Sequence, residues 1–538
     1  MLNKNSEIIL CSGIKMDKEY ENVLSYSESD FVALCRTNQI YNGLKYAIIQ
    51  PDTIDIAASY DVCIFANYIA FINPRYGNKW FFAWVTDVRL LNPSTTRITF
   101  KVDVWSTWYS RFTIGKAFIE REHVTDDTAG KHTIPENLEL GDYVVNYENK
   151  NKQFNTLNVI VASNIDPTLD ANNQLIGGHV KGAVYNKIPT GFKYYYFENN
   201  STSSLTTVLK AFDEAGAANS IIAIFLAPYN AFDKVDSTIL DNGQVKQTFS
   251  AKLLDWENNI TGDVAPTKLT SLDGYTPVNK KLLTFPYCYL RVSNNNGSDA
   301  IFHYEKFANV EGGYCHFQML CSICPGMSII LYPSAYDGIS SNYNESLSAG
   351  KFPTCGWASD SYTNWLTQNG VNIVSSLTGD ALQIAAGAGA IASGVGASGG
   401  IYNVASGIGG IRSTLTTIYE HKFNPIQAKG NVNVGDVKTS GNLNTFTAYG
   451  MSIKKEFAKC IDQYFSRFGY QINEVKTPSL TSRTKFNFIK VGGMDELISG
   501  NIPATDLDEI NRIFRKGVTI FHTYSDFGNY TVSNPVSS

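Results

Sequence analysis

Apolar and polar residues alternate along much of the first 120 residues of the chain. In the segment RITFKVDVW, residues 97–105, the apolar positions are Ile98, Phe100, Val102 and Val104, and the positions between them are Thr99, Lys101 and Asp103. A period of two residues is the pattern of a β-strand that buries one face. The runs YIAFIN at 68–73 and FFAWVTDVRLL at 81–91 precede this segment, with turn residues between them. This succession predicts an antiparallel, mainly β unit.

Short apolar runs continue between residues 150 and 350, separated by turns such as DNGQ at 241–244 and NNNG at 294–297. They predict a second region of short strands. One helix is expected among these strands at residues 204–216, with Ser204 as N-cap and Gly216 as the stop. The predicted fold class is mainly β (α+β), with a few peripheral helices.

Two late segments, residues 451–469 and 505–517, predict two further helices. The apolar face of the first is formed by Ile453, Phe457, Ile461, Phe465 and Phe468. The expected N-cap and stop are Ser452 and Gly469 for the first helix, and Thr505 and Gly517 for the second.

The run ALQIAAGAGAIASGVGASGGIYNVASGIGGI, residues 381–411, contains no charged side chain. It exceeds the roughly 20 residues that a helix needs to cross a bilayer, but it is rich in Gly, Ala and Ser. Gly396 and Gly400 form a GxxxG pair, which lets helices approach closely in lipid. Each interior Gly costs about 1 kcal/mol relative to Ala, which disfavours an isolated helix in water. The β-branched apolar residues of the run are Ile384, Ile391, Val395, Ile401, Val404, Ile408 and Ile411.

Three interpretations of this run compete. A flexible linker explains the Gly and Ser but not the density of Ile and Val. A constitutive anchor lacks a Leu-rich core and a basic stop. The favoured interpretation is a conditional element, which is covered in an oligomer and released into lipid, with Tyr362 and Trp365 at the membrane interface.

Composition limits the possible functions. The 538 residues are enough for several domains, and a hydrophobic fraction of 43% indicates a folded protein. The formal net charge is −5, and the basic pairs Lys280-Lys281 and Lys454-Lys455 are isolated. Because dedicated nucleic-acid binding needs a basic stripe, this composition argues against it.

Nine cysteines at scattered positions form no disulfide framework. Cys315, His316, Cys321 and Cys324 suggest a zinc site, but no further pair completes it. We therefore expect a strand with free thiols, and no metal or cofactor. The N-terminal segment has too short an apolar core for a signal peptide, so synthesis in a cytoplasm is expected.

The most distinctive charged segment is FIEREHVTDDTAGKHTIPENLELGDYV, residues 118–144. Asp126, Asp127 and His132 are candidate metal ligands, and the charged residues just before them are candidate catalytic groups. The favoured interpretation is structural: alternating charges at the end of a strand form ion pairs, and Pro135 and Gly141 mark an extended connector. The core of the segment is Glu120, Arg121, Glu122, His123 and Val124.

This block, together with VDVWSTW at 102–108, resembles the signature of tail-knob, or distal tail-tube, proteins of small short-tailed bacteriophages that infect Gram-positive bacteria. The order of features along the chain is similar to that of the family too. The resemblance implies a β-barrel related to tail tubes, assembled as a homo-hexameric tube that double-stranded DNA crosses without sequence-specific binding. Hydrophobic loops of the family plug the tube and then insert into the host cytoplasmic membrane as a pore.

The resemblance also implies partners and a location. The chain would be part of the virion tail, in contact with a proximal tube or collar protein and a tail-tip protein. The expected division is a tube domain in two parts, 1–150 and 413–538, an inserted β-rich knob domain, 151–355, and the membrane-active loop, 356–412.

Enzymatic interpretations have little support, because the chain lacks GxSxG, HExxH, P-loop and Rossmann motifs. A cell-wall hydrolase with paired carboxylates is the enzymatic alternative. A tail adhesin, or receptor-binding protein, that recognises cell-wall polymers is the main alternative, because Tyr, Trp and Asn on β-loops suit sugar binding. A pore-forming toxin would share the loop but normally needs a secretion signal. We expect no enzymatic activity.

Overall fold

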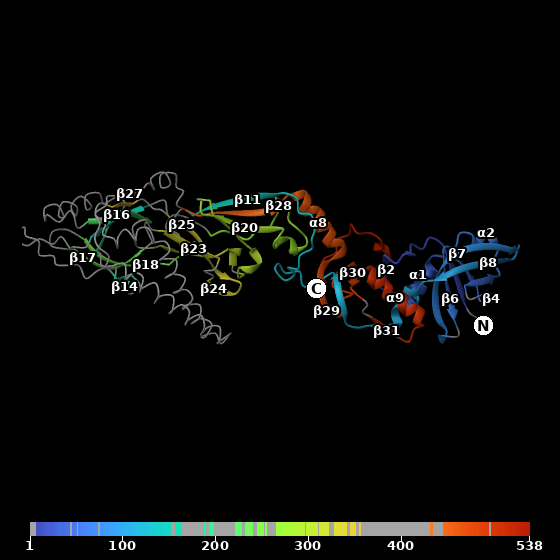
Figure 1. Ribbon diagram of the computed structural model, residues 1–538. Helices are drawn as coiled ribbons and strands as arrows, with labels where there is room; N and C mark the ends of the chain where they lie inside the picture. The colour runs from blue at the N-terminus through green and yellow to red at the C-terminus, as the bar shows by residue number, and fades with distance from the viewer. Residues whose placement is uncertain are drawn as a thin grey trace, which may run out of the picture. The chain divides into compact units, whose positions relative to one another are not determined.

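The computed structural model of the chain is shown in Figure 1. It describes residues 7–43, 46–50, 52–73, 76–151, 157–163, 184–185, 188–189, 193–197, 221–228, 232–239, 245–251, 253–255, 265–295, 297–309, 311–321, 328–341, 345–350, 354–356, 431–433, 445–493 and 497–537. The chain divides into two compact units. Unit 1 comprises Met1–Leu140, Pro277–Leu282 and Glu456–Ser538, and unit 2 comprises Gly141–Thr276 and Leu283–Lys455. The chain therefore passes between the units four times.

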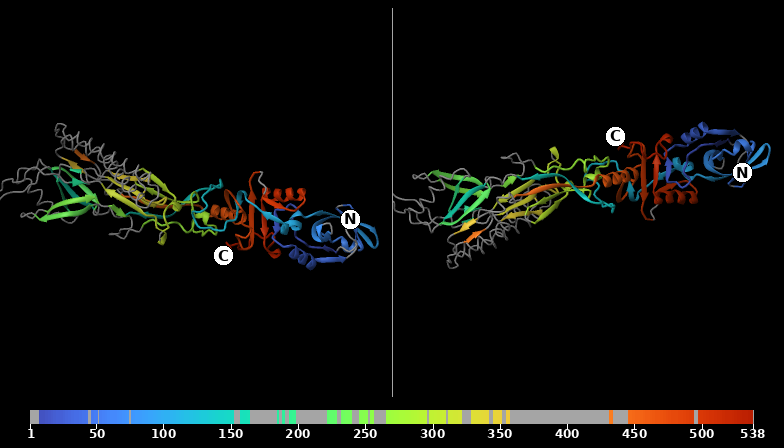
Figure 2. Two further views of the ribbon diagram at one scale, coloured as in Figure 1. Left: turned by 90° about the horizontal axis from the view of Figure 1, so that it is seen from below. Right: turned by 90° about the horizontal axis from the view of Figure 1, so that it is seen from above.

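Unit 1 begins with a seven-stranded antiparallel sheet in the order β3-β1-β6-β7-β8-β5-β4. Its edge strands β3 and β4 are separated by two residues, a link that spans at most about 11 Å. A flat sheet of this width would hold its edges about 29 Å apart, so the sheet must curl. It forms a half-barrel whose edge strands are not paired with each other in the described residues. The blue strands in Figure 2 curve in this way. The strands are β1 (Ile8–Cys11), β3 (Gln39–Gly43), β4 (Tyr46–Gln50), β5 (Thr53–Ile56), β6 (Tyr68–Asn73), β7 (Lys79–Asn92) and β8 (Thr95–Val102).

Large side chains fill the inside of this barrel. Phe71 lies 5.2 Å from Phe100 and 5.8 Å from Phe81, measured between ring centroids. Tyr68 and Trp84, which are also buried and make an edge contact, lie on the opposite face of the sheet, because side chains alternate along β6 and β7. The barrel of one chain is thus a packed core rather than a channel.

The alternation predicted for residues 97–105 is confirmed at Ile98 and Phe100, which are buried in β8. It is wrong beyond Val102, where the strand ends and helix α3 (Val104–Trp108) begins. Asp103 was expected on the polar face but is buried, because its carboxylate caps α3 through the Ser106 backbone N–H, 3.1 Å away.

A second sheet of unit 1 has the order β2-β32-β30-β10-β29, with only the pairing of β2 and β32 parallel. One hydrophobic core joins it to the barrel, and in that core Trp105 of α3 lies 5.5 Å from Phe514 of α9. These strands are β2 (Asn22–Leu24), β10 (Ala117–Glu122), β29 (Tyr470–Lys476), β30 (Phe486–Val491) and β32 (Val518–Phe521), and a separate pair is β9 (Phe112–Ile114) with β31 (Ile498–Gly500). Further helices of unit 1 are α1 (Glu28–Thr37), α2 (Tyr60–Cys63) and α9 (Ala504–Lys516).

The two predicted late helices are present as α8 (Lys455–Phe468) and α9. Both predicted stops are confirmed: Gly469 has φ 66° and Gly517 has φ 94°. Both predicted N-caps are wrong. Ser452 is a buried residue of strand β28, and Thr505 lies inside the first turn of α9, which starts after Pro503. The sequence alone does not reveal that the strand continues to Ile453, because its last residues also suit the helical apolar face.

The described parts of unit 2 are mainly β-sheet, with short 3-10 helices at Tyr304–Lys306 and Glu311–Gly313. The helix predicted at residues 204–216 lies outside the described residues. A four-stranded sheet has the order β11-β28-β20-β21, and a five-stranded sheet has the order β15-β12-β16-β26-β27. The strands of the first are β11 (Tyr143–Lys150), β20 (Cys288–Ser293), β21 (Asp299–Phe302) and β28 (Thr447–Ile453). The strands of the second are β12 (Leu157–Ser163), β15 (Lys193–Phe197), β16 (Ile221–Pro228), β26 (Thr354–Gly356) and β27 (Asn431–Asn433).

The remaining strands of unit 2 form one sheet and two hairpins. The sheet contains β19 (Leu253–Asp255), β22 (Phe317–Cys321), β23 (Ser328–Tyr336), β24 (Ile339–Ser341) and β25 (Leu347–Gly350), and the hairpins are β13 (Val184–Tyr185) with β14 (Ile188–Pro189), and β17 (Phe232–Ile239) with β18 (Val245–Ala251). The predicted mainly β fold with a barrel is confirmed. The finer division at residues 150, 355 and 412 stays a prediction.

Candidate functional site

Apart from Gly356, the predicted membrane-active loop lies outside the described residues, and so do its interfacial aromatics Tyr362 and Trp365. The structure does describe the strands on either side of it. β26 ends at Gly356, and β27 begins at Asn431 and pairs with β26 in antiparallel register. The described chain therefore stops at Gly356 and resumes at Asn431 on one pair of neighbouring strands. Among the described helices, none combines the length and hydrophobicity needed to cross a bilayer. The residues outside the description are Ile384, Ile391, Val395, Gly396, Gly400, Ile401, Val404, Ile408 and Ile411.

The signature segment, residues 120–124, lies at the end of β10, which runs between β29 and β30. A bulge at Glu120 interrupts the pairing on both sides, and its carboxylate accepts a hydrogen bond from Lys490, 2.7 Å away. The next acid, Glu122, is buried and pairs with Lys476. Burial raises the pKa of Glu122, and Lys476 opposes that shift. Each acid therefore holds a neighbouring strand through a basic partner.

Arg121, between these acids, belongs to a buried group of three charges. The side chain of Glu136 has no exposed surface and pairs with both Arg121 and Lys281. It also accepts a hydrogen bond from the backbone N–H of Gln471 at 2.9 Å. Burial lowers the pKa of Lys281, whereas the hydrogen bond to Glu136 raises it. Because a buried charge is costly unless it is paired, these side chains depend on one another.

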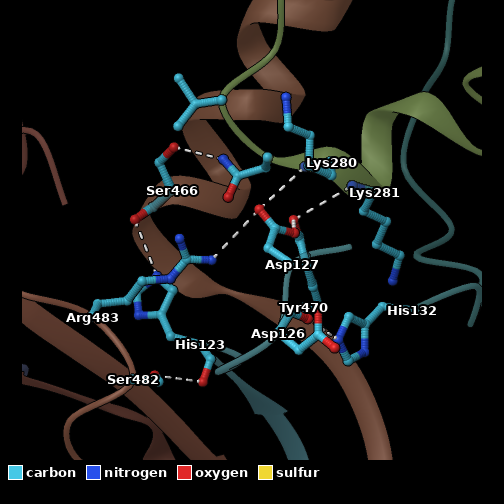
Figure 3. A network of polar contacts seen from close by, with 12 residues as sticks. His123, Asp126, Asp127, His132, Lys280, Lys281, Ser466, Tyr470, Ser482 and Arg483 are labelled. Carbon is cyan, nitrogen blue, oxygen red and sulfur yellow. Dashed lines mark hydrogen bonds and ion pairs between the residues drawn. The ribbon is translucent and has the colours of Figure 1, made fainter. Parts of the chain in front are cut away.

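His123 extends the sheet past the end of β10. Its backbone N–H donates to the carbonyl of Phe488 at 3.2 Å, and its Nδ1 accepts from the Phe488 N–H at 2.8 Å. Its Nε2–H donates to the carbonyl of Ser466 in α8 at 3.2 Å, as Figure 3 shows. Burial, with the nearby Arg483 cation, lowers the pKa of His123 to about 3. The imidazole is thus neutral, and it joins β30 to α8. Val124, the last residue of the segment, is also buried.

Gly469, which ends α8, lies directly against the signature segment. A Cβ atom at this position would meet the carbonyl oxygen of Glu122 at 2.1 Å and the backbone nitrogen of His123 at 2.5 Å. Its own carbonyl accepts a hydrogen bond from Arg121 Nη1 at 2.7 Å. Both this close approach and the positive φ require glycine here.

The candidate metal ligands are occupied by protein partners. Asp126 accepts hydrogen bonds from Thr128 and pairs with Lys131 at 2.9 Å, and these contacts lower its pKa. Asp127 accepts from the Tyr470 hydroxyl and from the Lys280 backbone N–H, as Figure 3 shows. The His132 Nε2–H donates to the Asp126 carbonyl at 2.8 Å. In the described part of the chain, no group of three or more His, Cys, Asp or Glu residues is placed to hold a metal ion.

The proposed zinc cluster can be placed only in part. Cys315 is buried and free, and Cys321 ends β22, whereas Cys324 lies outside the described residues. Burial raises the pKa of Cys315 to about 12, so this thiol is protonated near neutral pH.

The polar network around the signature segment therefore has a structural role. It joins three pieces of unit 1 that continue into unit 2: the connector after His123, the segment Pro277–Leu282, and α8. All four passages of the chain between the units start or end in these pieces. Sequence reasoning missed Glu136, Lys281 and Gly469 as members of the network, because their partners in it lie 15 to 348 residues away along the chain. No local pattern carries that signal.

Fold and network together define a mainly β structural protein, and comparisons with known proteins agree. The family model described as Bacillus phage phi29, Tail knob protein gp9, C-terminal domain, matches residues 247–535. A second model, Caudoviral major tail protein N-terminus, matches residues 4–113, the region of the barrel. Because the first match covers more than half of the chain, the chain belongs to the tail knob protein family of phi29 gp9. It is therefore a structural component of the virion tail, and the expectation of a non-enzymatic role is confirmed.

Individual relatives show how far the similarity extends. The chain is 25% identical to the tail knob protein gp9 of Bacillus phage phi29, over 98% of both chains. It is 24% identical to that of Bacillus phage B103, over 99% of this chain and 98% of the relative. The solved structure of the bacteriophage C1 tail knob protein gp12 matches in fold, with a TM-score of 0.66 and 14% identity, over 99% of this chain and 100% of the other.

Proposed function

We propose that the chain assembles as a hexamer into the distal tube of a phage tail, and that residues 356–412 plug this tube and later insert into the host membrane. The observation that carries the proposal is the uncharged run 381–411 in a member of the tail knob family. The pairing of β26 with β27 supports it, because the described chain before residue 357 and after residue 430 belongs to one sheet. A loop rooted in this way can leave its place without disturbing the sheet.

The packed barrel favours a conduit between chains. Phe71, Phe81 and Phe100 occupy the space inside the barrel of one chain, so duplex DNA has no path through it. A ring of chains creates a lumen at its axis. The net charge of −5 also suits a conduit, since a wall that paired with phosphates would retard the DNA.

A ring also suits membrane insertion. Each buried CH2 group contributes about 0.8 kcal/mol, and six loops add their contributions around one axis. Backbone groups within lipid must be hydrogen-bonded, so the inserted loops would form helices packed through small residues or strands of a closed wall. Contacts with a proximal tube or collar protein and with a tail-tip protein complete the proposed tail.

Dye release from liposomes tests the membrane step. Intact protein is compared across pH 4 to 8 with a variant that lacks residues 381–411 and with the double substitution Ile391→Asp and Val395→Asp. We expect leakage from the intact protein and none from either variant, with the assembled mass unchanged in native mass spectrometry. Equal leakage from all three proteins, or none from any, would contradict a membrane role for the loop.

One observation favours a second candidate, a tail adhesin that grips cell-wall polymers. Aromatic rings gather at one end of the four-stranded sheet of unit 2: Tyr143 contacts Tyr289 at 5.2 Å, and Phe285, which is 38% exposed, stacks on His303 at 4.1 Å. Such rings suit the apolar faces of sugars. If this function is correct, Phe285→Ala weakens binding to purified cell walls, whereas deletion of residues 381–411 leaves binding intact.

A further inference from the structure

Unit 1 contains a short strap, residues Pro277–Leu282, whose two flanks both belong to unit 2. The chain thus leaves unit 2, crosses unit 1 for six residues and returns. A segment this short has little surface to bury. The two ends of the strap are two of the four passages of the chain between the units. The contacts that hold the strap therefore decide whether these two passages stay fixed to unit 1.

The grip on the strap is polar and comes mainly from Asp462 of α8. The Asp462 carboxylate accepts from the backbone N–H of Val278 at 2.8 Å and from that of Asn279 at 3.0 Å. The Asn279 amide donates to the same carboxylate at 2.7 Å and to the Ser466 hydroxyl at 2.8 Å. Asn279 and Asp462 are each 2% exposed. A single carboxylate thus satisfies three donors of the strap in a site shielded from water.

The rest of the strap is held in the same way. The Lys280 backbone N–H donates to Asp127 at 3.3 Å, and the Lys281 ammonium pairs with Glu136. Of the apolar residues of the strap, Pro277 and Leu282 are buried and Val278 is 65% exposed, so apolar anchoring is confined to the two ends of the strap. Water can replace polar partners more readily than it can replace a packed core, so the strap can separate from α8 while the core of unit 1 stays intact.

We propose that the strap is a catch, held closed by the Asp462 carboxylate, that opens as a local unit without unfolding of unit 1. Opening releases two of the four passages and leaves unit 2 joined through the connector before Gly141 and through α8. Ser466 links the catch to the signature segment, since its hydroxyl accepts from Asn279 and its carbonyl accepts from His123. This proposal rests only on the contacts between the strap and α8, so it does not depend on the membrane role of the loop.

The strap contains its own reporter, the pair Lys280-Lys281, which trypsin cleaves only in an extended, accessible chain. In the closed catch, Lys281 is 4% exposed and its ammonium is held by Glu136. We expect Asp462→Asn to raise the cleavage rate at this pair by about tenfold or more relative to the other Lys and Arg sites, read by intact mass. Asn279→Ala, on the strap side, should act in the same direction. Asp508→Asn, an exposed residue of α9, is the matched control and should leave the rate unchanged.

Equal cleavage of the pair in both catch variants and in the native chain would overturn the proposal. If trypsin instead cleaves the variants faster at every Lys and Arg site, the variants have unfolded as a whole. Hydrogen exchange of the unaltered protein then tests whether the strap opens locally. The amides of Val278 and Asn279 must then exchange faster, and with weaker denaturant dependence, than the Phe488 amide in β30. Exchange of all three amides only through global unfolding would also overturn it.

Discussion

His123 shows how one buried side chain sets a pH dependence. Its pKa is about 3 in the folded chain and 6.5 when unperturbed, so between these values the unfolded state binds more protons. The free energy of unfolding therefore falls as the pH drops from 6.5 to 3, by up to about 1.4 kcal/mol per pH unit from this residue. His123→Asn keeps an acceptor near the position of Nδ1 but removes this titration. In urea unfolding at pH 4, 5, 6 and 7, the variant should show a shallower slope with pH, and identical slopes would contradict the assignment.

Gly469 gives a second prediction at the residue scale. Gly469→Ala places a Cβ atom 2.1 Å from the Glu122 carbonyl oxygen, and the nearest atoms are all backbone, which cannot turn aside as the end of a flexible side chain can. We expect a loss of at least about 3 kcal/mol in the free energy of unfolding, because steric overlap adds to the cost of a positive φ. Gly528→Ala is the control: it has φ 75° and open space, so only about 1 kcal/mol is expected. Similar losses in both variants would show that the close approach is relieved elsewhere.

At the scale of elements, Glu136 links the connector to β10, β29 and the strap. Glu136→Gln leaves Arg121 and Lys281 buried without a counter-charge, and we expect a loss of about 3–5 kcal/mol in stability. Glu509→Gln, which removes the partner of the exposed Arg512, should cost no more than about 1 kcal/mol. Thermal and urea unfolding measure both variants. A small effect at Glu136 would mean that water or another acid reaches the two cations.

Strands and helices could be predicted from the sequence where a local pattern of apolar residues determines them. The period of two in β8 and the period of 3.6 in α8 and α9 are local, and so are the glycines that end both helices. Partners were not predictable in this way. β10 pairs with β29 and β30, more than 340 residues later, and Asp462 meets the strap about 180 residues before it. Asp103 is buried although the strand period predicts exposure, because its carboxylate caps α3.

At the scale of the whole molecule, the filled barrel and the charge balance lead to one prediction about DNA. A tube wall must let phosphates pass, and binding strength for duplex DNA rises with the number of phosphates that basic residues neutralise. This chain has 44 basic and 49 acidic residues, and many bases of unit 1 are already paired, such as Arg97 with Asp55 and Lys79 with Glu28. The assembled protein should therefore not retain a 30-base-pair duplex in a gel-shift assay at about 50 mM salt, where phosphate contacts are strongest. Retention that weakens steeply towards 200 mM salt would reveal a basic surface facing the lumen, and with it a wall that holds DNA instead of letting it pass.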